Sequence, residues 1–237
     1  MKNLPIKAWI LIVAVAAAGV AVFGKAMLQW GQGHDYTRFA AYLAVAVVTA
    51  RCRVTLPRMT SSMAVNLPFI LVAVLTLSLP EALTIAAVST FVQSFWPDGR
   101  KPDPVQVFFN VSVLVMAAQL TWWTLRFNFH NAALAVAACG VTILLANTVP
   151  VAAIIGVTEN KKFGQTWLNI VQLTFPYYLA AVGLAGLVEL ANHAVGWQMP
   201  LFILPATFLM YRSFRTYFGQ MSEAAPGPRA VAARAAH

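Results

Sequence analysis

Residues 59–80 read MTSSMAVNLPFILVAVLTLSLP, a stretch with no charged side chain between Arg58 and Glu81. Two further uncharged runs cover residues 163–188 and 190–211. Over the whole chain, 60% of the residues are hydrophobic and only 10% are charged, which is the balance of a membrane protein. Runs of this length are buried in lipid, where a helix satisfies its own backbone hydrogen bonds. The sequence therefore predicts an all-α fold, a polytopic transmembrane helical bundle.

The apolar runs predict about eight spans, since a hydrocarbon core needs about 20 apolar residues per helix. We expect them at residues 8–29, 37–50, 64–79, 81–96, 104–125, 132–156, 165–189 and 196–212. The second, third and fourth have about 15 residues each, which is about 22 Å of helix. These three must bring flanking arginines to the interface, thin the bilayer or sit partly re-entrant.

The basic residues test this count. If the N-terminus is cytoplasmic, 13 of the 16 basic residues fall on the inside, and Lys25, Arg38 and Arg126 fall on the outside. Such asymmetry follows the positive-inside rule and predicts that both ends are cytoplasmic, in a bacterial inner membrane. It also accounts for the formal net charge of +9 without nucleic-acid binding. The lipid bilayer is then the first partner of the chain.

The ends of the chain predict one bundle and one tail. We expect the helical bundle at residues 1–218 and a disordered cytoplasmic tail at 219–237, where Ala, Pro and Arg dominate. A cleaved signal peptide is the alternative for the first span, because Lys2 and Lys7 precede an apolar stretch and small residues. The apolar stretch continues to Leu28, which favours a retained span.

The titratable residues weigh against several membrane activities. A haem-b site needs histidines that face each other inside the bundle, but His34, His130 and His193 fall in loops or at helix ends. The chain contains no HExxH, P-loop or GxSxG motif. Charges near the middle of a span, which are typical of pumps, are absent too. We therefore expect a protein that is not an enzyme, and the sequence identifies no cofactor.

Neutral polar residues inside the spans are the strongest candidates for a ligand site. Gln106 and Asn110 are four residues apart, which places them on one helix face. The whole set is Asn66, Gln93, Gln106, Asn110, Asn147 and Gln172. These residues would form a small polar pocket for a neutral or aromatic ligand. The alternative is that the amides only cross-link helices and satisfy carbonyls freed by nearby prolines.

A second set of polar residues maps to the predicted outer face. Its members are His34, His130, Glu189 and His193, with Asp35 and Glu81 on the same side. Glu189 and His193 share a helix face if the seventh helix continues that far. Imidazole with carboxylate is a combination that binds metal or senses pH. The alternative is that loops carry polar residues, and that Glu81 favours a helix N-terminus after Pro80.

Five short motifs occur in order along the chain: LPRMT at 56–60, SLPEAL at 78–83, QSFW at 93–96, PVQVFFN at 104–110 and YRSFR at 211–215. Together they resemble the multi-helix N-terminal membrane sensor region of bacterial HD-GYP and GGDEF signalling proteins. The resemblance implies a sensory or anchoring domain whose last helix leads to a cytoplasmic output module. No HD pair, GYP or GGDEF follows here, so cyclic dinucleotide turnover is not implied.

Three functions remain open at this point. The first is a sensor-like or anchoring bundle that relays a membrane or outer-face signal to a cytoplasmic partner. The second is a small solute-binding subunit of a membrane transporter, of the type that binds vitamins. The third is a structural subunit of a larger membrane complex.

Overall fold

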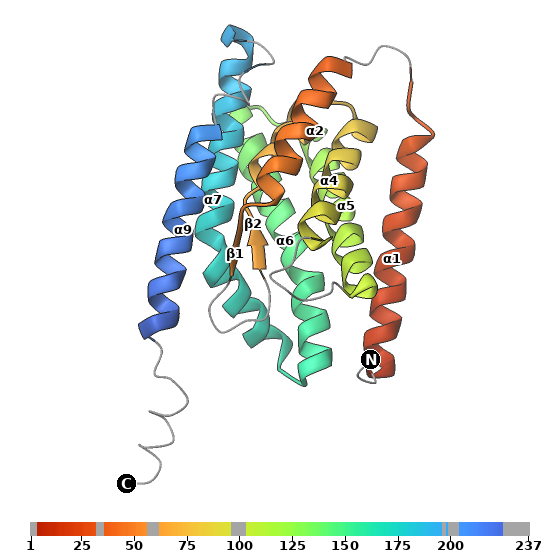
Figure 1. Ribbon diagram of the computed structural model, residues 1–237. Helices are drawn as coiled ribbons and strands as arrows, with labels where there is room; N and C mark the ends of the chain where they lie inside the picture. The colour runs from red at the N-terminus through yellow and green to blue at the C-terminus, as the bar shows by residue number, and fades with distance from the viewer. Residues whose placement is uncertain are drawn as a thin grey trace, which may run out of the picture.

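The computed structural model describes residues 4–31, 36–55, 62–95, 103–195, 198 and 204–224. Within these residues the chain forms eight helices and one two-stranded sheet (Figure 1). The helices are α1 (Ile6–Met27), α2 (Tyr36–Ala50), α3 (Leu67–Thr76), α4 (Leu79–Phe95), α5 (Pro104–Leu125), α6 (Ala132–Glu159), α7 (Phe163–Val195) and α9 (Leu204–Ala224). The strands are β1 (Arg53–Thr55) and β2 (Ser62–Ala64). Four helices, α1, α5, α6 and α7, are long and apolar enough to cross a membrane.

The expected all-α class is confirmed, and each of the eight predicted segments contains a helix. α5 has the predicted bounds because Asp103 caps it and Pro104 occupies its first turn. The Asp103 side chain accepts a hydrogen bond of 2.9 Å from the backbone N–H of Val105. Whether all eight helices cross the membrane, and in which direction, stays a prediction.

The last helix lies further along the chain than predicted. α9 begins at Leu204 and runs to Ala224, whereas the apolar run predicted 196–212. Helix continues past Arg212 because Phe218 is buried in the core, while the charged side chains of Arg212 and Arg215 stay exposed. The first six residues of the predicted disordered tail, 219–224, are therefore helical. The rest of that tail, 225–237, lies outside the described residues.

The strand pair explains why two of the predicted spans are short. β1 and β2 are antiparallel, with Val54 opposite Met63, and the N–H of Val65 bonds to the carbonyl of Cys52 at 3.1 Å. In Figure 1 the pair lies below the end of α2, near the middle of the bundle's height. The chain therefore leaves the helical conformation part-way through the bundle, and paired strands continue the path of α2 and α3.

α3 lies at the centre of the bundle. It contacts α2, α4, α5 and α7, and every residue from Leu67 to Val74 is buried. Its sequence, LPFILVAVLT, is apolar on every side, as a helix surrounded by other helices requires. The shortest of the described helices is therefore the core element around which longer helices pack.

Glu81 has a structural role at the start of α4. Its carboxylate accepts hydrogen bonds from the backbone N–H of Ser78 at 3.0 Å and from the Ser78 hydroxyl at 2.6 Å. The bond from the Ser78 N–H to the Glu81 carboxylate is one half of a capping box, and it satisfies a free N–H group at the helix start. The helix-terminus interpretation of Glu81 is thereby confirmed.

Candidate functional site

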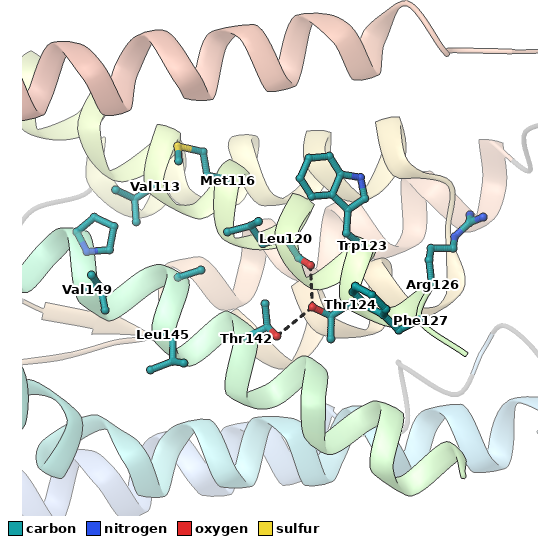
Figure 2. Close-up of a pocket in the computed structure, with 12 residues that line it drawn as sticks. Val113, Met116, Leu120, Trp123, Thr124, Arg126, Phe127, Thr142, Leu145 and Val149 are labelled. Carbon is teal, nitrogen blue, oxygen red and sulfur yellow. Dashed lines mark hydrogen bonds between the residues drawn. The ribbon is translucent and has the colours of Figure 1, made fainter. Parts of the chain in front are cut away.

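The six predicted amides lie in three different environments. The side chains of Gln106 and Gln172 are exposed, and those of Gln93 and Asn110 are half-buried. Asn147 is also half-buried and bonds to a neighbouring helix, and Asn66 is buried. Two hollows of the bundle are a cavity between α2 and α9 and a groove between α5 and α6 (Figure 2), and none of the six residues lines either of them. The structure therefore does not gather them into one pocket.

Asn147 joins two helices. Its side-chain amide on α6 donates a hydrogen bond to the hydroxyl of Tyr178 on α7. One residue further along α6, the hydroxyl of Thr148 accepts a bond of 3.1 Å from the indole N–H of Trp167 on α7. Hydrogen bonds of this kind hold helices together in membranes. At this position the contacts agree with the bracing interpretation.

Asn66 occupies the break between β2 and α3. Its carbonyl accepts bonds from the N–H groups of Phe69 and Ile70, which start the helix. The side chain is only 3% exposed, yet its amide nitrogen has no hydrogen-bond partner among the described residues. Leaving a buried polar group unsatisfied costs about 1–3 kcal/mol. Such a donor is available to a ligand or a water molecule.

A cavity of about 340 Å³ lies next to this break. Thr49 and Cys52 line it from the end of α2, and Val65 lines it from the residue before Asn66. Its opposite wall is the start of α9, including Thr207, Phe208 and Tyr211. None of the described residues that line it is charged. The cavity suits a small, neutral and largely apolar molecule.

The depth of this break follows from one hydrogen bond. The N–H of Leu67 donates to the hydroxyl of Tyr177 at 3.1 Å. Tyr177 lies 14 residues after the start of α7 and 18 before its end, so the break lies near the middle of the longest helix. At membrane depth, irregular backbone occurs where it is buried in protein or lines a cavity. Broken helices near the midplane hold the substrate in many transporters.

Tyr177 and Tyr178 are the site residues that sequence reasoning missed. Tyr177 contacts α3 through the Leu67 bond, and its ring packs edge-to-face on Phe214 of α9, with centroids 6.2 Å apart. Tyr178 meets Asn147 on α6. The sequence feature that could have pointed to them is Pro-Tyr-Tyr at 176–178, two hydroxyl-bearing residues inside a long uncharged run. These two tyrosines connect the break to both α6 and α9.

The predicted metal residues do not form a metal site among the described residues. His130 is exposed between α5 and α6, and His34 lies outside the described residues. α7 continues to Val195, so Glu189 and His193 are four positions apart on one helix, as expected. Glu189 is half-buried, with one carboxylate oxygen buried and unpartnered in the described part of the chain. No group of three His, Cys, Asp or Glu in that part is placed to hold a metal ion.

No protein-family model, curated protein or solved structure matches this chain.

Proposed function

We propose that this protein is a membrane-embedded sensor that binds a small neutral molecule between α2 and α9. The observation that carries the proposal is that α9 supplies a whole wall of the 340 Å³ cavity. The same helix then continues beyond the cavity with Arg212 and Arg215 exposed. Occupancy of the cavity would act directly on the helix that leads out of the bundle.

The contacts of α9 suit a relay. Its first two turns line the cavity, and its next turns pack Phe214 on Tyr177 and bury Phe218. A ligand shifts such a helix only if it binds one position of α9 more tightly than another. The cavity wall and the Phe214–Tyr177 contact are the places where that difference arises. The exposed arginines then offer a basic face to a cytoplasmic partner.

Two sequence observations support the same proposal. The 13-to-3 distribution of basic residues favours a bacterial inner membrane with the end of α9 on the cytoplasmic side. The resemblance of 56–120 and 211–218 to membrane sensor regions gives α9 the position of the exit helix.

A solute-binding transport subunit is the second candidate. The break between β2 and α3 near the middle of α7, beside a cavity, favours it, because broken helices at mid-depth are typical of transporters. The two candidates differ in what they require of α9. A sensor needs α9 to respond to occupancy, whereas a binding subunit needs only that the molecule is held.

The test begins with native mass spectrometry of the purified full-length protein, for a retained small molecule. We expect wild type and Cys52→Ser to retain it, and Cys52→Phe, which places a bulky ring in the cavity, to lose it. Hydrogen exchange of the α9 amides then separates the candidates. A sensor should show at least a twofold change in exchange at residues 212–222 between Cys52→Ser and Cys52→Phe.

Retention of the molecule by Cys52→Phe would show that the cavity is not the site. Loss of the molecule with unchanged exchange in α9 would favour the transport subunit over the sensor.

A further inference from the structure

A second hollow lies on the side of the bundle, between α5 and α6. It is a groove of about 800 Å³ (Figure 2). Leu120 and Trp123 line it from α5, and Leu145 and Val149 line it from α6. All four side chains are exposed, so the groove opens at the surface of the bundle. Its walls are almost entirely apolar.

The packing of α1 and α6 accounts for the groove. α1 covers the first half of α5, where Ile12 and Val15 form one cluster with Phe109 and Val113. Beyond that cluster no residue of α1 lines the groove. Pro150 of α6 removes the backbone bond to the carbonyl of Ala146, and both residues lie in the groove wall. The groove is therefore an interhelical space that the bundle leaves uncovered.

One end of the groove carries a positive charge. Arg126 follows α5 directly, and its guanidinium carbon lies 3.9 Å from the centroid of the Trp122 ring. Stacking on an indole ring orients a guanidinium group. Arg126 forms no ion pair with an acidic side chain of the described residues. In Figure 2 it lies at the end of the groove beyond Trp123 and Phe127.

The length of the groove matches one leaflet of a bilayer. From Val113 to Arg126 the path along α5 is 13 residues, or about 20 Å. Half of a hydrocarbon core is about 15 Å, which leaves about 5 Å for the start of the headgroup region. Tryptophans at this end agree with a position at the membrane interface.

We propose that this groove binds one acyl chain of an anionic phospholipid, with the lipid phosphate at Arg126. The free energy of an acyl chain changes little when the chain moves from the bilayer into the groove, since both surroundings are apolar. Selectivity must therefore come from the headgroup charge, and one basic residue near the surface gives a preference of about fivefold. The Thr124 and Thr142 hydroxyls, 3.0 Å apart in the groove wall, bond to each other and to carbonyls of their own helices. They leave the chain-binding part apolar.

Two other occupants compete with the lipid in this proposal: a second copy of the protein and a free phosphate ion. A free anion would need only Arg126 and would make no use of the groove. A second copy would cover the groove and exclude lipid from it. The experiment is designed so that each occupant gives a different result.

The experiment is native mass spectrometry of the full-length protein, titrated with phosphatidylglycerol and with phosphatidylethanolamine of the same acyl chains. We expect wild type to bind one phosphatidylglycerol about fivefold more tightly than phosphatidylethanolamine. Arg126→Gln should lose this preference, and Arg126→Lys should keep it. Lys25→Gln is the matched control: α1 and α5 run in the same direction, so this variant removes a charge at the same end of the bundle, away from the groove. It should keep the preference.

Ala146→Phe, which places a bulky ring in the middle of the groove, should remove the tight lipid while the rest of the lipid binding persists. Three results would overturn the proposal. They are an unchanged preference in Arg126→Gln, full competition by inorganic phosphate in place of lipid, and a lipid-free dimer that Ala146→Phe dissociates.

Discussion

At the scale of single residues, the bundle depends on small side chains where two helices approach most closely. A Cβ atom on Gly19 of α1 would lie 2.6 Å from the Cβ of Ser112 and 2.8 Å from its Cα on α5. The second atom belongs to the backbone, so α5 could not avoid the clash by a side-chain rotation. Gly24, one turn later on the same helix, has no atom within 4 Å of such a Cβ. Small residues let membrane helices pack closely, and only one of these two glycines is used that way.

Gly19→Ala should therefore lower the free energy of unfolding by about 1–3 kcal/mol, the usual cost of overpacking. Gly24→Ala is the matched control and should be neutral or slightly stabilising, since alanine favours helix. Thermal unfolding in detergent measures both. Equal stability of the two variants would contradict the close contact between α1 and α5.

At the scale of elements, the α6–α7 pair shows which amides brace the bundle. Asn147 and Tyr178 join the helices at mid-length, and Thr148 and Trp167 join them next to that point. Gln172 lies on the same helix as Tyr178, but its side chain is exposed. An amide in a span therefore has a bracing role only where it reaches a partner on the neighbouring helix.

Asn147→Leu should lower the free energy of unfolding by roughly 0.6 kcal/mol, the average value of an interhelical hydrogen bond in a membrane. Gln172→Leu, the control on the paired helix, should leave stability unchanged within about 0.5 kcal/mol, as is usual for exposed positions. Chemical denaturation in mixed micelles measures both variants, and the difference in stability appears as a shift in the midpoint denaturant concentration of unfolding. A larger loss in Gln172→Leu than in Asn147→Leu would contradict this assignment of roles.

At the scale of the whole molecule, α1 begins and α9 ends at the same end of the bundle, while α1 and α9 lie at opposite edges of it (Figure 1). A chain that crosses a bundle an even number of times begins and ends on the same side, so this arrangement agrees with an even number of crossings. The strand pair matters here because α2 alone, with 15 residues, is about 22 Å long and falls short of a hydrocarbon core of about 30 Å. Strands after α2 and before α3 lengthen both segments, which the eight-span prediction requires of α2 and α3.

Reporter fusions test the direction of the crossings. We expect fusions after Pro80, His130 and His193 to report the outside, and fusions after Lys101 and Lys162 to report the cytoplasm. The physical reason is the preference of basic residues for the cytoplasmic side. A cytoplasmic signal at His193 would contradict the eight-span topology, whatever the other fusions report.

The sequence by itself determined the approximate position of every described helix except the last, which begins at Leu204 and ends at Ala224. Apolar length, prolines and capping residues are local properties, so Asp103 and Pro104 predict the start of α5 without knowledge of its neighbours. The hydrogen bond from the Ser78 N–H to the Glu81 carboxylate is local in the same way. At the end of α9 the hydropathy signal failed, because Phe214 and Phe218 have apolar partners that a window around Arg212 cannot show.

Only the tertiary structure decided which helix lies at the centre and which polar residues meet. In a water-soluble protein the apolar face of a helix marks its buried side. Here lipid and bundle interior are both apolar, so the pattern does not distinguish the two sides of a span. The bond between Leu67 and Tyr177 joins residues 110 positions apart. The buried side-chain amide of Asn66, which has no partner among the described residues, and the α9 wall of the cavity follow from that long-range packing, which no local pattern encodes.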